Sequence, residues 1–190
     1  MRLLLLNGPP RSGKDTLANL VSAKFPSLIA HMKMSGYLKE MASKLFPYSF
    51  DKEEWLEKNK DKKVEALYNQ TPRQVLIRLS EGFYKPLFGA DFFGHMMKAR
   101  INSIANFGYT GIVVSDCGFD EEIKPLWKVF GAENVRVVRL YRSHCDFQDD
   151  SRAYVYAHEH PGVEVTDYHN TTMERLDDFA AEQALWLANI

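Results

Sequence analysis

A glycine-rich turn between an apolar run and a helical pattern is the feature that most constrains this chain. Residues 3–6 are all leucine and predict a buried strand, and residues 8–16 read Gly-Pro-Pro-Arg-Ser-Gly-Lys-Asp-Thr. The spacing of Gly8 from Gly13 and Lys14 fits G-x-x-x-x-G-K, in which backbone N–H groups turn inward on phosphate oxygens and the lysine reaches the outer phosphates. A helix that starts directly after the loop adds its positive end. The pattern predicts strand, phosphate loop and helix in succession, with a nucleoside triphosphate as the ligand.

The two residues after Lys14 indicate which class of nucleotide-binding protein carries this loop. Asp15 stands where most such loops carry a metal-binding hydroxyl, and Thr16 supplies a hydroxyl one residue later. Gly-Lys-Asp-Thr is closer to the GK-x-T of nucleoside monophosphate kinases than to the GK[ST] of GTPases and motors. Asp15 and Thr16 are therefore candidate Mg²⁺ ligands, and Lys14 and Arg11 are candidate catalytic residues. The expected ATP contacts are Gly8, Pro9, Pro10, Arg11, Ser12, Gly13, Lys14, Asp15 and Thr16.

Length and composition set the class of protein. The chain has 190 residues, of which 45% are hydrophobic and 26% charged, enough for one α/β domain. A formal net charge of −1 argues against a dedicated nucleic-acid or membrane-surface binder, which needs an excess of Lys and Arg. Two cysteines, no signal-like start and no apolar stretch near the roughly 20 residues of a membrane span predict a reduced, cytoplasmic protein.

The order of apolar and helical segments predicts the fold. Strand patterns alternate with helical patterns, which is typical of a three-layer α/β fold, a mostly parallel five-stranded sheet with helices on both faces. The expected strands are 2–7, 28–32, 111–115, 135–141 and 162–165. A helical stretch at 35–106 is expected to be an insertion that covers a substrate, and the polar segment 142–160 a mobile lid. The remaining segments, 1–34, 107–141 and 161–190, form the core of this single domain, and a capping box at residues 171–174 starts its last helix.

A second helix start carries chemical information. Thr71 and Gln74 match a capping box and Pro72 takes the first helical position, so Arg73 falls in the first turn. The helix dipole favours anions there, and a bound phosphate explains an arginine at that place. The alternative is a surface arginine paired with a carboxylate.

Further along the same helix, one face is apolar and the other polar. Leu76, Leu79 and Phe83 are expected to form the buried stripe. Off that stripe lie three candidates for lining a nucleotide cleft: Arg78, Glu81 and Lys85. A structural ion pair is the alternative for Glu81.

Polar residues that follow later strands complete the predicted site, because the carboxyl ends of parallel strands share one edge of the sheet. Asp116 follows a buried strand, as a Walker B carboxylate does near Mg²⁺; capping the next helix is the alternative. Arg142 and Arg152 are the lid cations expected to stabilise a transferred phosphoryl group. Arg139 is expected only to lie on a face of the sheet, without a role in catalysis. Zinc binding by His144, Cys145, His158 and His160 is disfavoured because the spacing contains no CxxC pair.

Taken together, these residues resemble the deoxynucleoside monophosphate kinases of the bacteriophage type. The likeness spans most of the chain and rests on motifs at residues 11–16, 71–76, 89–91, 114–122 and 169–170. It implies transfer of the ATP γ-phosphate to a deoxynucleoside 5′-monophosphate, with Lys14 and Thr16 at ATP and its Mg²⁺ and Arg73 at the acceptor phosphate. Lys39, in Gly-Tyr-Leu-Lys, corresponds to a lysine after the second strand, and a homodimer is implied.

Two departures from that pattern stand out. Gly118 occupies a position at which the family carries arginine, so a cationic contact is missing or comes from another residue. The lid carries Asp150-Ser151-Arg152 where members often have His-x-Ser-Glu.

Proteins with other functions also contain a phosphate loop. A nucleotide switch needs the motifs N-K-x-D and D-x-x-G. Residues 59–62 match N-K-x-D without its final aspartate, and residues 91–94 match D-x-x-G but lie in a helical region. A non-catalytic nucleotide-binding subunit does not explain an arginine-bearing lid. Kinases for dephospho-coenzyme A or sugar acids are nearer alternatives.

Overall fold

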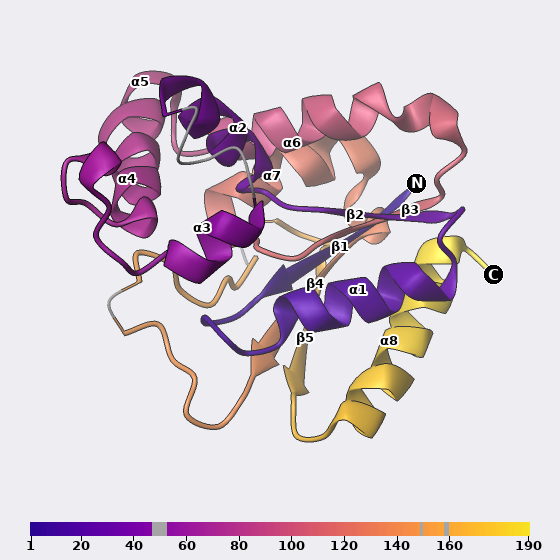
Figure 1. Cartoon of the computed structure of the whole chain (residues 1–190). Coiled ribbons are helices and arrows are strands. Elements are labelled where there is room, and N and C mark those ends of the chain that lie inside the picture. The colour runs from indigo at the N-terminus through magenta and orange to yellow at the C-terminus, as the bar shows by residue number, and fades with distance from the viewer. Residues whose placement is uncertain (47–52, 149, 158–159) are drawn as a thin grey trace. The chain divides into compact units, whose positions relative to one another are not determined.

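The computed structural model describes residues 1–46, 53–148, 150–157 and 160–190. The chain forms two compact units, one of Met1–Met34 with Gly94–Ile190 and one of Ser35–Phe93 (Figure 1). Each unit has its own hydrophobic core.

A five-stranded parallel sheet is the centre of the first unit. Its strands are β1 (Arg2–Asn7), β2 (Ile29–Met32), β3 (Gly111–Val114), β4 (Val135–Tyr141) and β5 (Glu164–His169). Their spatial order is β2-β3-β1-β4-β5, and every neighbouring pair is parallel. The three-layer α/β fold predicted from the sequence is confirmed, and all five strands end at one edge of the sheet.

The fifth strand lies later than residues 162–165, where its apolar pattern placed it. Gly162 has a φ of 90°, and the N–H of Val163 donates to the carbonyl of His160, so these residues form a turn. Pairing with β4 begins at Glu164 opposite Arg136 and continues to His169 opposite Tyr141.

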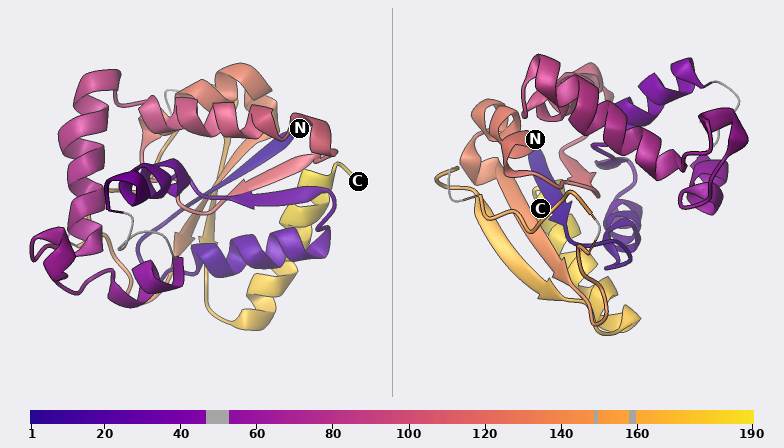
Figure 2. Two further views of the ribbon diagram at one scale, coloured as in Figure 1. Left: turned by 45° about the horizontal axis from the view of Figure 1, so that its top comes forward. Right: turned by 90° about the vertical axis from the view of Figure 1, so that its left-hand side faces the viewer.

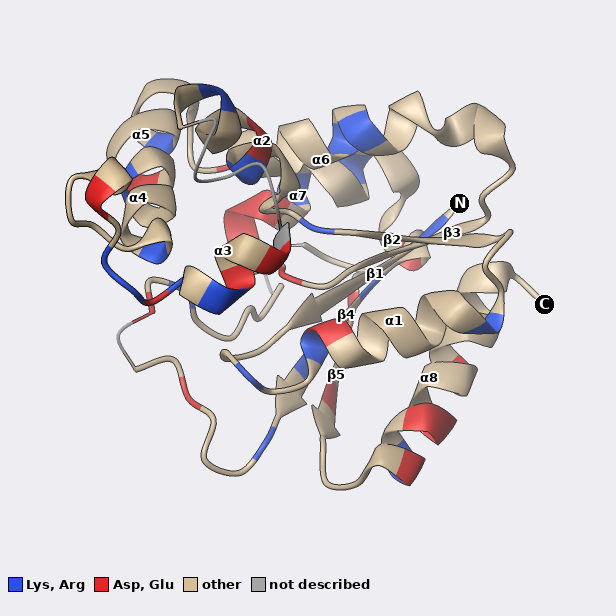
Figure 3. Ribbon diagram, viewed as in Figure 1, with Lys and Arg blue, Asp and Glu red and all other residues tan. Residues whose placement is uncertain are grey.

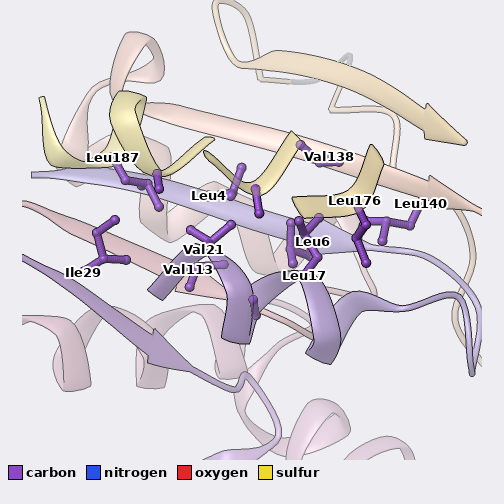
Figure 4. Packing of buried hydrophobic residues seen from close by; sticks show 13 residues of the cluster. Leu4, Leu6, Leu17, Val21, Ile29, Val113, Val138, Leu140, Leu176 and Leu187 are labelled. Carbon is purple, nitrogen blue, oxygen red and sulfur yellow. The ribbon is translucent and has the colours of Figure 1, made fainter. Parts of the chain in front are cut away.

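Helices cover both faces of this sheet (Figure 2). On one face lie α1 (Lys14–Lys24) and α8 (Met173–Ala188), and on the other α7 (Asp120–Phe130) with the part of α6 (Phe92–Ser103) that belongs to this unit. Short 3₁₀ turns occupy Ala105–Phe107 and Ala132–Asn134. Figure 4 shows the core between the sheet, α1 and α8. It consists of Leu4, Leu6, Leu17, Ala18, Val21, Ile29, Val113, Val138, Leu140, Leu176, Ala180, Ala184 and Leu187.

The last helix packs through the predicted apolar face, but its start is shifted by one residue. Thr172 is the N-cap, and its hydroxyl accepts the N–H of Arg175 at 3.3 Å. The predicted capping box of Thr171 with Glu174 is therefore wrong. Arg175 takes the third helical position and has no acceptor with which to complete such a box.

The second unit is helical, as predicted. It contains α2 (Gly36–Leu45), α3 (Glu53–Asn59), a 3₁₀ turn (Glu65–Leu67), α4 (Pro72–Leu79), a π-helical turn (Ser80–Tyr84) and α5 (Lys85–Phe88). Its core is formed by Ala42, Leu56, Leu67 and Val75. The unit ends at Phe93 rather than near residue 106 because the next helix packs into the first unit. There, Met97 and Ile101 are 1% and 0% exposed.

The capping box at Thr71 is confirmed. Its hydroxyl accepts the Gln74 N–H at 3.1 Å, and the Gln74 side chain accepts the Thr71 N–H at 2.9 Å. The predicted burial of Phe83 is wrong, because this side chain is 50% exposed. The π turn that starts at Ser80 adds a residue to the helical repeat and rotates later side chains off the stripe.

None of the helices in the described ranges is both long enough and apolar enough to cross a membrane.

Removing the α4 cap tests this local structure. Thr71→Ala is expected to lower the free energy of unfolding by about 1 kcal/mol, because the Gln74 N–H loses its acceptor. Urea unfolding followed by far-UV circular dichroism measures the change. Thr171→Ala, an exposed threonine that caps no helix, is the control and should cost less than about 0.5 kcal/mol. Equal losses in the two variants would contradict the capping role.

Candidate functional site

The loop between β1 and α1 is built around its two glycines. Gly13 is the N-cap of α1 with a φ of 104°, a conformation that side-chain-bearing residues rarely adopt. A Cβ on Gly8 would lie 2.7 Å from the Leu140 carbonyl oxygen, so the loop approaches the end of β4 too closely for any other residue. Asn170, just past β5, donates from its side-chain amide to the Ser12 carbonyl at 2.9 Å. The ends of β4 and β5 therefore hold the loop in shape.

Lys14 lies over this loop. Its ammonium donates to the carbonyl oxygens of Gly8 at 2.7 Å and Pro9 at 2.6 Å. Burial and, to a smaller extent, the positive charge of Arg152 lower the pKa of Lys14 to about 8, against the opposing effect of nearby carboxylates. A buried cation beside another cation is stabilised by an anion bound between them. The placement of Lys14 suits a phosphate.

Arg11 and Arg142 meet at the outer side of the loop. Arg11 has a φ of 66° and an exposed side chain, and its carbonyl accepts from the Arg142 guanidinium at 3.2 Å. Arg142 directly follows β4 and is exposed. Two of the predicted catalytic arginines thus lie at the phosphate loop.

Asp15 connects the loop to the end of β3. Its carboxylate accepts from the Ser115 hydroxyl at 2.7 Å and lies 3.6 Å from the Lys33 ammonium. Burial raises the pKa of Asp15, but the Ser115 hydrogen bond and the charges of Lys33, His31 and Lys14 outweigh burial and hold it below its usual value. Asp15 is ionised at neutral pH, and its side chain, like that of Thr16, is exposed.

This pairing reverses the usual placement of donor and acceptor. P-loop enzymes commonly carry the hydroxyl on the loop and the carboxylate on the strand. Here the loop supplies the carboxylate of Asp15 and the strand end supplies the hydroxyl of Ser115. Ser115 lies within the motif at residues 114–122, but the sequence pattern predicted no role for it.

Asp116 follows Ser115 and accepts the backbone N–H of Met34, just past β2. The alternative role as a helix cap is wrong, because α7 begins after Phe119. The carboxylates of Asp15 and Asp116 both interact with Lys14 and are hard oxygen donors, which fit Mg²⁺. A group of three or more His, Cys, Asp or Glu suited to a metal is absent from the described residues. Mg²⁺ needs no such group where phosphates supply further ligands.

The end of the predicted lid is anchored to the first unit. Buried Asn7 donates to the Ala153 carbonyl at 3.0 Å and accepts the Val155 N–H at 3.1 Å. The first turn of α7 is acidic (Figure 3). There, the Asp120 carboxylate accepts the N–H groups of Tyr156 and Ala157. These hydrogen bonds attach residues 153–157 to β1 and α7.

His160 is likewise a structural residue. Its Nδ1 accepts from the Trp127 indole at 2.8 Å, and its Nε2 lies 2.9 Å from the Asp120 carbonyl. Both ring nitrogens of His160 therefore have partners within the first unit. His158 lies outside the described residues.

Arg139 and Arg152 have different surroundings. Arg139 forms two hydrogen bonds, at 2.6 and 2.9 Å, with Asp167 on the neighbouring strand, which fits its expected place on the sheet face. Arg152 forms two hydrogen bonds, at 2.8 and 2.6 Å, with Asp150, whose side chain is only 8% exposed. This pairing was not predicted, because a carboxylate two residues from an arginine has no distinctive sequence pattern.

The predicted acceptor residues belong to the second unit. Arg73 donates to Asp61 at 2.7 Å, Arg78 to Gln70 at 2.8 Å, and Lys85 lies 3.1 Å from Glu81. Asp61 is the carboxylate partner that the surface ion-pair alternative expected for Arg73. The pair of Glu81 with Lys85 is likewise the structural ion pair that was the alternative for Glu81. Lys39 lies in the first turns of α2 and is partly buried.

Comparisons with known proteins give little further information. No family model matches the chain, and no curated protein matches it. Among solved structures, an unliganded sugar kinase from Janibacter sp. HTCC2649 aligns with 100% of this chain and 95% of its own, at 14% sequence identity and a TM-score of 0.49. A likeness of that degree carries no conclusion about activity or substrate.

The pKa of Lys14 makes a prediction for ligand binding. At pH 8 about half of the Lys14 side chains are neutral, and an ADP phosphate raises the pKa, so binding should take up about half a proton. Above pH 8 the affinity for ADP should fall as the ammonium is lost.

Isothermal titration of ADP at pH 8, in two buffers that differ in ionisation enthalpy, measures the uptake. Lys14→Arg stays charged at this pH and is the control, with no uptake expected from that side chain. Identical binding heats of the unchanged protein in both buffers would contradict the lowered pKa.

Proposed function

We propose that this protein transfers the γ-phosphoryl group of ATP to a deoxynucleoside 5′-monophosphate, giving ADP and the deoxynucleoside diphosphate. The observation that carries the proposal is the group of cations at the phosphate loop. Lys14 lies over the loop, Arg142 contacts its outer side, and the charge of Arg152 acts on Lys14. Phosphoryl transfer spreads negative charge over the equatorial oxygens, which such cations stabilise.

The loop and its cations account for the donor half of the reaction. Backbone N–H groups at the start of α1 bind the ATP phosphates, and Lys14 binds their outer oxygens. An oxygen of the acceptor phosphate attacks the γ-phosphorus in line, and the bond from that phosphorus to the β-bridging oxygen breaks. The acceptor is already an anion, so no general base is required. Mg²⁺, for which Asp15 and Asp116 are the candidate ligands, neutralises phosphate charge when bound.

The acceptor half is assigned to the second unit. Arg73 lies in the first turn of a helix that begins with a complete capping box, where an arginine and the helix N-terminus attract the same anion. Asp61 has to release Arg73 for a phosphate to bind it. Preference for a deoxynucleoside monophosphate rests on the resemblance carried by residues 11–16 and 71–76.

The nucleotide-switch alternative is weakened by the structure. The D-x-x-G match at residues 91–94 runs into α6, and Asp61 of the N-K-x-D-like segment pairs with Arg73. We accordingly propose small-molecule nucleotides as the partners of this chain, the cytoplasm as its location and a homodimer as its assembly.

Acceptor dependence is the decisive test of the function. With ATP and Mg²⁺, ADP is expected to form only when a deoxynucleoside monophosphate is added, because the acceptor phosphate is the nucleophile. A coupled ADP assay over all deoxynucleoside and ribonucleoside monophosphates, dephospho-coenzyme A and sugar acids measures this. Lys14→Ala is the negative control. An equal rate of ATP hydrolysis without any acceptor, or transfer only to a non-nucleotide, would contradict the proposal.

The role of Arg73 gives a second prediction. Arg73→Ala is expected to raise the KM for the acceptor about 10- to 100-fold with a smaller change in kcat, since a charged hydrogen bond to phosphate contributes roughly 1.5–3 kcal/mol. Asp61→Asn should leave that KM unchanged or lower it, because the arginine loses a competing partner. A change in unfolding free energy alone would show that Arg73 is only a surface ion pair.

A further inference from the structure

The backbone conformation at Gly118 does not require a glycine. Gly118 lies outside the set of glycines with positive φ, so other residues are compatible with its conformation. It is nonetheless buried, and a Cβ at this position would lie 2.5 Å from Cδ and 2.7 Å from Cγ of Arg152. The absence of a side chain at residue 118 therefore makes room for the stem of Arg152.

Neither side of this contact can move easily. The Gly118 N–H lies 3.4 Å from the buried Glu122 carboxylate, and the preceding carbonyl, of Cys117, accepts from the Asn7 amide at 2.9 Å. On the other side, the Asp150 carboxylate accepts from the Arg152 guanidinium at 2.6 and 2.8 Å and from the Arg152 backbone N–H at 3.0 Å. A methyl group at residue 118 would displace the guanidinium.

The segment that carries this guanidinium is attached next to the phosphate loop, because the Ala153 carbonyl accepts from the side-chain amide of Asn7, the residue before Gly8. The charge of Arg152 acts on Lys14, Asp116 and Glu122. Two of its N–H-bearing nitrogens bind Asp150, and guanidinium has five N–H groups in all. Two neighbouring cations gain most from an anion that contacts both.

We infer that Gly118, Asp150 and Arg152 form one phosphate-binding unit, in which Arg152 contacts the outer phosphate, Asp150 positions its guanidinium and Gly118 provides the space for its stem. The expected effect of this unit on phosphoryl transfer rests on the proposed function. Its expected effect on phosphate binding does not. It also accounts for the glycine at a position where the family pattern has arginine, because side chains at residues 118 and 152 compete for one space.

A double-mutant cycle on phosphate binding tests the unit. The probe is inorganic tripolyphosphate, titrated calorimetrically without nucleotide or acceptor. Arg152→Ala should weaken binding about 10-fold, and Gly118→Ala should weaken it by a similar factor because it displaces the same guanidinium. In the Arg152→Ala background, Gly118→Ala should change the affinity less than about twofold. The Arg152 Cβ that remains would lie 3.4 Å from the new methyl group, an ordinary contact.

Two further variants complete the cycle. Gly82→Ala is the matched control, because a Cβ there meets nothing within 4 Å, and it should bind tripolyphosphate as the unchanged protein does. Asp150→Asn should weaken binding severalfold when Arg152 is present and have no effect when residue 152 is alanine. That dependence is not expected of a merely structural carboxylate.

The outcomes separate this inference from the proposed function. Equal losses from Gly118→Ala in both backgrounds, or no loss at all, would overturn the inference even if acceptor-dependent ADP formation is found. The expected cycle together with no phosphoryl transfer would overturn the proposed function and retain the unit. If Gly118→Ala alone fails to fold, folding of the double variant supports the inference, and failure of both overturns it.

Discussion

The buried side chain of Asn7 is the interaction on which the site depends. It is fully buried at the end of β1, one residue before the phosphate loop. Its amide donates to the carbonyls of Cys117 and Ala153, and its oxygen accepts the N–H of Val155. One side chain thus joins the central strand, the segment after β3 and the segment that carries Arg152. Without it, three backbone groups would lose this partner, and for the two buried ones, the Cys117 carbonyl and the Val155 N–H, the loss costs roughly 1–3 kcal/mol each.

Electrostatic balance explains how so many charges coexist near one loop. Lys14 is satisfied by carbonyl oxygens, Asp15 by a hydroxyl and Lys33, and Arg152 by a carboxylate that is itself almost buried. Each of these charges has a local partner in the first unit. The charges are therefore positioned by the protein itself, which under the proposed function lowers the cost of positioning them during transfer.

Local patterns predicted most of the fold and the position of the glycine-rich loop. The phosphate loop, four of the strand positions and the cap at Thr71 follow from contiguous residues, so a single sequence reveals them. The π turn at Ser80 is invisible to a 3.6-residue period, and Phe83 was misplaced for that reason. The partners of Arg152 and Asn7 depend on segments distant in sequence or without any distinctive spacing. Periodicity carries no information about such contacts.

The crowding between residues 118 and 152 also has a consequence for divergence. A chain of this fold cannot gain a side chain at residue 118 while the Arg152 stem keeps its place, since the two would occupy the same volume. Substitutions at these positions are therefore expected to be correlated among relatives, with a small residue at one whenever a large one occupies the other. A change of arginine from one position to the other requires an intermediate in which the site holds one cation fewer.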